Sequence, residues 1–184
     1  MRRDFFSVGS MVVGLWSLLT PAQAEQTASF VLPSGVAVEI VEDVFDRSLF
    51  EVEVSGSDAG YVLLINGQMP FGSDLSLPFS YVKHIRVTHR GKTYELDVSN
   101  MYNAWGNRHQ STEKYGVRYF GGKCVEDGDG RKYCRFRGLF SDAAGAYVAE
   151  WRIYNGVSQR TILSDNCDVM YFVSEHIDPE EISN

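Results

Sequence analysis

The fold is decided by the stretch YVAEWRIYNGVSQRTIL, which runs from Tyr147 to Leu163. In its first half, residues with apolar or aromatic side chains alternate with other residues around Trp151, the period of a strand that buries one face. Asn155-Gly156 then separates this run from a second one, and both residues tolerate the positive φ angles of a type I′ turn. The stretch therefore predicts a β-hairpin with strands at 147–154 and 157–163.

Strand patterns continue toward the N-terminus from this hairpin. A second hairpin is predicted at 82–89 and 92–98, joined by Arg90-Gly91, and a third pair of strands at 117–120 and 135–139. Further strands are expected at 36–41, 49–54 and 61–65, the last fully buried. Loops or polar connections are expected at 25–29, 42–47, 55–60 and 68–78, and a short helical turn at 99–105.

One helix is predicted near the C-terminus. Val169, Phe172, Val173 and Ile177 recur at helical spacing before Pro179, and Ser164 or Asp165 can cap the first turn. The predicted fold class is therefore α+β and β-rich. A single antiparallel sheet, a half-barrel or a sandwich packs against the C-terminal helix.

The first 24 residues have the three parts of a secretory signal peptide. Arg2 and Arg3 give a positive start, an apolar run is densest at Met11–Leu19, and Ala22-Gln23-Ala24 supplies the small residues of a cleavage site. We therefore expect residues 1–24 to be cleaved and residues 25–184 to form a single β-rich exported domain. The expected location is the periplasm, without a membrane anchor.

The three cysteines are interpreted in that oxidising compartment. Cys124 and Cys134 flank a stretch rich in turn-forming residues, which favours a disulfide that joins two neighbouring strands. Cys167 is then unpaired. The alternative, in which Cys167 pairs with one of the other two cysteines, stays open.

Composition and motifs exclude several classes of function. The net charge is −7 and no long Lys or Arg run offsets it, so nucleic acid and anionic membranes are not expected as partners. Ser80-Tyr81-Val82-Lys83 resembles a serine-enzyme motif, but it precedes a strand instead of starting a helix. Asp127-Gly128-Asp129-Gly130 lacks the ligand pattern of a calcium loop, and the histidines lack zinc spacing. We expect no enzyme activity, metal or cofactor, although a pair of catalytic carboxylates stays an open alternative.

Two segments have the composition of recognition surfaces. Around Tyr102, Trp105 and Arg108, aromatic and Met residues lie among Asn and Gly, a mixture typical of interface hot spots. The alternative is that Tyr102 and Trp105 fill one end of the sheet. The second segment is the acidic tip at Glu126, Asp127 and Asp129, which could approach a cationic cleft or simply be a solvated turn.

In overall character the chain is small, exported, acidic and β-rich, with one disulfide. In this it resembles the periplasmic immunity proteins that neutralise toxins delivered by rival bacteria, and equally exported inhibitors of lysozymes or proteases. The expected function is a periplasmic protein-binding module, an immunity or inhibitor protein that occludes the active site of an exported toxin or hydrolase. The alternatives are an envelope protein that binds a small lipid or glycan ligand in a half-barrel, and a carboxylate hydrolase.

Overall fold

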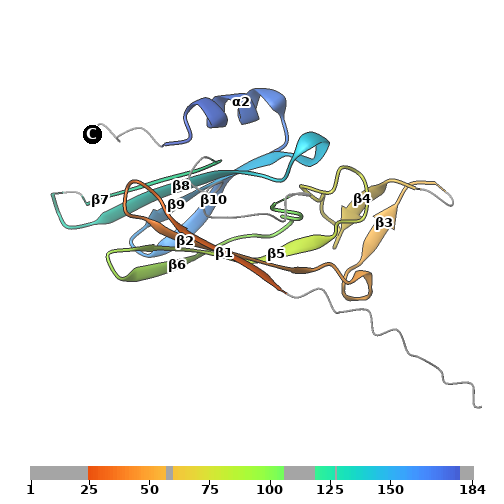
Figure 1. The fold of residues 1–184 in the computed structure, drawn as a ribbon, viewed down its shortest axis with the longest axis horizontal. Helices are drawn as coiled ribbons and strands as arrows, with labels where there is room; N and C mark the ends of the chain where they lie inside the picture. The colour runs from red at the N-terminus through yellow and green to blue at the C-terminus, as the bar shows by residue number, and fades with distance from the viewer. Residues whose placement is uncertain (1–24, 57–59, 106–118, 127, 179–184) are drawn as a thin grey trace, which may run out of the picture.

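The computed structural model describes residues 25–56, 60–105, 119–126 and 128–178. In these residues the protein is mostly antiparallel β-structure, with two four-stranded sheets, a two-stranded sheet at one end and a helix over one face (Figure 1). No helix among the described residues is long and apolar enough to span a bilayer.

The first sheet has the strand order β1-β2-β5-β6. Its strands are β1 (Gln26–Val31), β2 (Ala37–Val44), β5 (Ser80–His89) and β6 (Lys92–Leu96). The predicted hairpin of β5 and β6 is confirmed, with Arg90 and Gly91 at φ 48° and 74°. The predicted loop at 25–29 was wrong, because Ala28 and Phe30 alternate inward from β1 and are buried. The predicted polar connection at 42–47 was also wrong in part, because β2 continues to Val44.

The second sheet has the order β10-β9-β8-β7. Its strands are β7 (Phe120–Glu126), β8 (Lys132–Phe140), β9 (Tyr147–Tyr154) and β10 (Val157–Ser164). The hairpin predicted from the opening stretch is confirmed: Tyr154 pairs with Val157, and Asn155 and Gly156 have φ angles of 48° and 86°. The predicted disulfide is also present, since Cys124 and Cys134 are direct partners across β7 and β8 and are bonded to each other.

One hydrophobic core lies between the two sheets. The second sheet contributes mainly aromatic side chains, each at most 1% exposed: Phe120, Phe136, Phe140, Tyr147 and Trp151. The first sheet faces them with aliphatic side chains such as Ile40, Ile85 and Val87. Of the predicted architectures, the single sheet is therefore wrong and the two-sheet arrangement is the one observed, because both sheets need each other to bury one face.

The predicted C-terminal helix is α2 (Cys167–Glu175), and it covers the outer face of the second sheet near β8 and β9 (Figure 1). Its cap is Asn166, whose side chain accepts hydrogen bonds from the amides of Asp168 and Val169. The prediction of Ser164 or Asp165 as cap was wrong by one or two residues. Cys167 is exposed and unpaired.

A smaller unit extends from one end of the sandwich. It contains a 3-10 turn at Arg47–Leu49 and the two-stranded sheet of β3 (Val52–Val54) and β4 (Val62–Ile65). The strand predicted at 61–65 exists, but it is not fully buried, because Leu63 is 46% exposed. No helical turn forms at 99–105. Met101 and Tyr102 instead make isolated β-bridges to Phe71 and Tyr81, which attach this unit to the sandwich.

Candidate functional site

The unit from Phe45 to Phe79, here called the lobe, is held against the sandwich by aromatic packing. Val62 and Ile65 are buried with Tyr102 beneath the lobe's two-stranded sheet. Around them, Phe45 and Phe50 stack with ring centroids 4.5 Å apart, and both rings meet Tyr102 edge-on. Such contacts fix the position of the lobe, so its outer surface is presented without a large ordering cost on binding.

Backbone hydrogen bonds tie the same unit together. The Phe45 amide donates to the carbonyl of Phe79 (2.9 Å), which joins the two ends of the lobe. Asn103 completes the attachment: its Oδ1 accepts from the amides of Phe79 and Ser80 at 2.8 and 3.0 Å, and its Nδ2 donates to the carbonyl of Gly72 at 2.7 Å. The lobe is therefore a fixed part of the fold.

The outer surface of the lobe is rich in exposed apolar side chains. Of the 13 exposed large hydrophobic residues in the described chain, eight belong to it: Leu49, Val54, Tyr61, Leu63, Met69, Leu75, Leu77 and Phe79. Three of them, Tyr61, Met69 and Phe79, are 62–67% exposed. Single exposed hydrophobic residues are ordinary, but a concentration on one small unit is typical of an interaction surface.

The charges of the lobe are almost all negative. Its sequence contains five acidic residues, Asp46, Glu51, Glu53, Asp58 and Asp74, and one basic residue, Arg47. Asp46 is held ionised, because the hydroxyl and amide of Ser48 donate to its carboxylate and lower the pKa of Asp46. An apolar surface with acidic groups favours a partner whose own surface is apolar and basic.

A small polar hollow of about 160 Å³ lies at the base of the lobe, beside Phe79. The turn of Ser73, Asp74 and Ser76 forms one side, and residues 141–145, the connection between β8 and β9, form the other. This volume is below the roughly 300–1,000 Å³ of sites for drug-sized ligands. It suits one inserted side chain better than a cofactor.

The backbone around this hollow is unusual. Five residues other than glycine have φ between 45° and 60°: Asp74, Leu75, Asn103, Ser141 and Ala143. Leu75 and Ala143 gain nothing from the left-handed region, which costs on the order of 1 kcal/mol or more per residue. Conformations of this kind persist only where surrounding contacts enforce them, and they are concentrated at binding and catalytic sites.

The structure separates the predicted recognition residues. Tyr102 is only 4% exposed, and burial raises the pKa of Tyr102 to about 12, so its ring supports the lobe from within. Trp105 is half-buried and meets Phe120 edge-on, with centroids 5.8 Å apart. These positions agree with the alternative that both rings fill the end of the sheets. Arg108 and Asp127 lie outside the described residues.

The predicted acidic tip is at the other end of the molecule, where β7 and β8 turn (Figure 1). Its carboxylates have basic neighbours. Glu126 lies 3.7 Å from Arg90 and 3.9 Å from Lys132, and Asp129 pairs with Arg131. The described tip is therefore of mixed charge, and a steering role for Glu126 and Asp129 stays a prediction.

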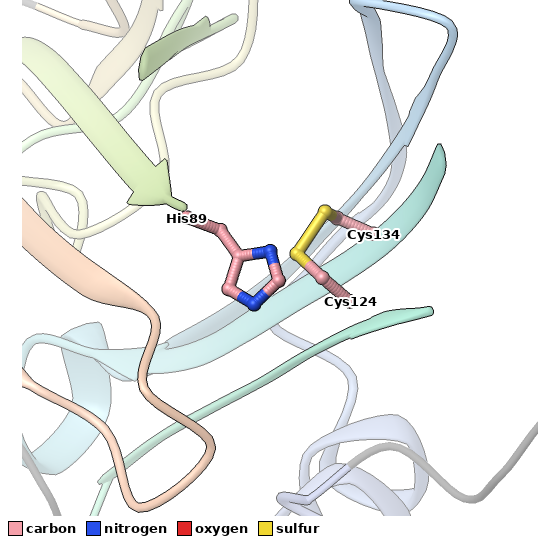
Figure 2. Close-up of side chains that lie close together, drawn as sticks. All are labelled: His89, Cys124 and Cys134. Carbon is pink, nitrogen blue, oxygen red and sulfur yellow. A yellow bond between two sulfur atoms is a disulfide. The ribbon is translucent and has the colours of Figure 1, made fainter. Parts of the chain in front are cut away.

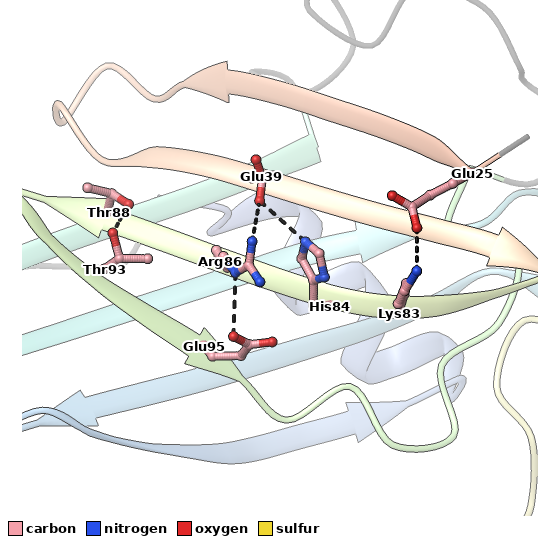
Figure 3. A network of polar contacts seen from close by, with 8 residues as sticks. All are labelled: Glu25, Glu39, Lys83, His84, Arg86, Thr88, Thr93 and Glu95. Atoms are coloured by element: carbon pink, nitrogen blue, oxygen red, sulfur yellow. Dashed lines mark hydrogen bonds and ion pairs between the residues drawn. The ribbon is translucent and has the colours of Figure 1, made fainter.

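The outer face of the first sheet carries a row of polar contacts (Figure 3). Glu39 accepts from Arg86 at 3.1 Å and lies 3.3 Å from His84, and Arg86 also reaches Glu95 at 3.4 Å. An open hollow of about 880 Å³ lies beside this row, between the hairpin of β1 and β2 and the strand β5. The large hollow is thus on the outside of the sheet, whereas aromatic rings fill the space between the sheets where a half-barrel ligand was expected.

The exposed apolar residues of the lobe were not singled out from the sequence. The run Tyr61-Val62-Leu63-Leu64-Ile65 is almost wholly apolar, and such a run predicts a strand buried on both faces. The one available signal was the acidic residues around it, Glu51, Glu53 and Asp58, which are unusual beside a strand in the centre of a sheet. Comparison with known proteins does not add to this: no protein-family model, curated protein or solved structure matches the chain.

Proposed function

We propose that this protein is an exported protein-binding module, and that the lobe is the surface that binds its partner. The observation that supports the proposal is the concentration of exposed apolar side chains on a small, acidic and firmly attached unit. The role we propose is that of an immunity or inhibitor protein, which needs no catalytic group of its own and acts by covering the active site of a toxin or hydrolase.

The side chains on the surface of the lobe indicate which chemical groups the partner should present. Tyr61, Met69 and Phe79 would contact apolar side chains at the centre of the interface, where aromatic and Met residues contribute most. The polar hollow beside Phe79, with Asp74 at its edge, would receive a Lys or Arg side chain of the partner. We therefore expect a basic partner whose binding weakens as ionic strength rises.

The test compares two variants with matched exposure. The lobe variant carries Tyr61→Ser, Met69→Ser and Phe79→Ser, at side chains that are 62–67% exposed. The control variant carries Val31→Ser, Val157→Ser and Tyr171→Ser, at 61–71% exposure outside the lobe. Each protein, with the disulfide intact, is immobilised and exposed to envelope and secreted fractions, and bound proteins are identified and then measured as purified pairs.

The expected result is one stoichiometric, basic partner that binds the wild type and the control variant and binds the lobe variant at least about tenfold more weakly. Circular dichroism and thermal unfolding are expected to show that both variants keep the wild-type fold. A partner held equally by both variants would place the interface elsewhere, and capture of nothing would contradict the protein-binding role.

The second candidate function is binding of a small envelope ligand. It is favoured by the open hollow of about 880 Å³ on the first sheet, lined by Glu39, Arg86, Thr88 and Thr93. The lining also includes apolar residues such as Phe30, Val31 and Val38, and a mixture of apolar and hydrogen-bonding groups is typical of a glycan or lipid-headgroup site. A thermal shift with cell-wall glycans that is lost in Arg86→Ala and kept in the lobe variant would favour this function over the first.

A further inference from the structure

A histidine from one sheet meets the disulfide of the other at the end of the sandwich away from the lobe. His89 is the last residue of β5, and Cys124 and Cys134 lie opposite each other on β7 and β8. The ligand atoms of the three side chains all lie within 4.8 Å of one another. Figure 2 shows the imidazole ring beside the sulfur–sulfur bond, with the histidine extending from β5.

The cluster borders a hollow, as a binding site does, and is not enclosed in the hydrophobic core. A hollow of about 340 Å³ adjoins it, lined by His89, Cys124 and Glu126 together with Arg90 and Lys132. Burial lowers the pKa of His89, and the charges of Arg90 and Lys132 lower it further. Imidazole nitrogen is a common ligand of metal ions in proteins, and here it lies within 4.8 Å of both sulfur atoms.

We propose that reduction of the disulfide turns this cluster into a binding site for a thiophilic metal ion of the Zn²⁺ class, with Cys124, Cys134 and His89 as the protein ligands. The reductant is a thiol. Two reductant thiols are oxidised to their own disulfide, while the Cys124–Cys134 bond breaks and each sulfur gains a proton. Binding of the ion then releases these two protons to solvent, and the thiolates and the imidazole nitrogen become its ligands.

The donor set and the distances fit this ion. Zn²⁺ is bound tetrahedrally, with bonds of about 2.3 Å to sulfur and 2.0–2.1 Å to nitrogen, so its ligand atoms lie roughly 3.3–3.8 Å apart. The three ligand atoms here already lie within 4.8 Å, so small side-chain rotations are sufficient once the sulfurs are separate.

The fourth coordination position of the proposed Zn²⁺ ion faces the hollow beside the cluster. Glu126 follows Cys124 by two residues on β7, so the two side chains leave the same face of the strand. A carboxylate oxygen of Glu126 or a water molecule can therefore complete the tetrahedron. In the oxidised protein the same ion is excluded, because sulfur atoms bonded to each other are not thiolates. The site is thus controlled by the redox state of the cysteine pair.

The experiment measures metal binding by the whole protein in a Cys167→Ser background, which removes the third thiol. Oxidised and phosphine-reduced samples are titrated with Zn²⁺ in competition with a chromophoric chelator, and with Co²⁺, whose thiolate complexes absorb in the near ultraviolet. The test variant is His89→Gln. The control is His84→Gln, on the outer face of the first sheet, and near-UV circular dichroism follows the fold in every sample.

We expect the reduced protein to bind one Zn²⁺ and the oxidised protein none. His89→Gln should weaken binding at least about tenfold, and His84→Gln should leave it unchanged. Three outcomes would each overturn the site. His89→Gln could bind Zn²⁺ as tightly as the wild type, or Cys124→Ser/Cys134→Ser could bind it equally well. The third is a reduced chain that neither keeps its fold nor regains it with Zn²⁺. The lobe is at the other end of the molecule, so none of these results decides the proposed function.

Discussion

Three arginine side chains of the second sheet surround the carboxylate of Glu150. Its side chain is 5% exposed and pairs with Arg137 at 2.7 Å, while Arg135 and Arg152 approach the other carboxylate oxygen at 3.7 and 3.5 Å. Arg137 is itself 6% exposed and also donates to the carbonyl of His176, just after α2. A buried pair of this kind is costly to break, because removal of one partner leaves the other charge without compensation.

We expect Glu150→Ala to lower the free energy of unfolding by about 3–5 kcal/mol, with a smaller loss in Glu150→Gln. Chemical denaturation measures both. The control is Glu95→Ala, because Glu95 is 61% exposed and its pair with Arg86 should contribute less than about 1 kcal/mol. Similar losses in Glu150→Ala and Glu95→Ala would show that burial of the Glu150 pair has no energetic effect.

The helix α2 is held to the sandwich by little apolar packing. Val173 is its one buried residue, whereas Tyr171 and Phe172 are 66% and 57% exposed. The helix therefore depends on its cap more than a buried helix would, since apolar packing contributes little. Its contact with the sandwich is extended by the chain after it, where the carbonyl of Ile177 lies against Gly121 in a space that a side chain would fill.

Asn166→Ala should destabilise α2 locally by about 1 kcal/mol, because the amides of Asp168 and Val169 lose their acceptor. Hydrogen exchange followed by mass spectrometry is expected to show faster exchange in residues 167–175 and unchanged exchange in β8 and β9. Asp165→Ala is the control, since Asp165 is adjacent but makes no capping bond. Equally fast exchange in Asp165→Ala would show that Asn166 is not the residue that caps α2.

Elements with a local signal were predictable, and elements set by distant contacts were not. The turns at Arg90-Gly91 and Asn155-Gly156 need positive φ at both positions, a requirement visible in two adjacent residues. The left-handed Asn103, which ties Phe79 and Gly72 together, depends on residues 24 and 31 positions away. The same applies to the candidate sites: the disulfide followed from a short loop, whereas His89 reaches it from the other sheet.

At the scale of the whole molecule, side chains join the two sheets along one side. Trp151 donates from Nε1 to the carbonyl of Asp97 at 2.8 Å, Arg160 donates to that of Ser99 at 2.6 Å, and Ser158 to that of Glu95 at 2.9 Å. These bonds connect β9 and β10 to β6 and the residues after it. The sandwich is thus closed on this side by side chains instead of by a backbone ladder, and the two sheets should unfold together.

Trp151→Ala is expected to lower the free energy of unfolding by about 3–5 kcal/mol in a single transition, because the side chain contributes to the core shared by both sheets. Far-UV and near-UV circular dichroism during denaturation provide the measurement, and the two curves should coincide. Tyr154→Ala, on the same strand but 47% exposed, should cost much less. Two separate transitions in the wild type would mean that each sheet is stable alone.

The position at which the chain enters the sandwich has a practical consequence for protein engineering. At the other end of the described chain, Ile177 lies beside Gly121 at the start of β7. The entering chain is closer to the lobe: Gln26 pairs with Glu42, which precedes the first residue of the lobe by three positions. A reporter domain or surface linker fused ahead of Gln26 would therefore start next to the lobe and crowd it. Attachment through Cys167, an exposed free thiol at the start of α2, would avoid this end of β1 and orient every immobilised molecule alike.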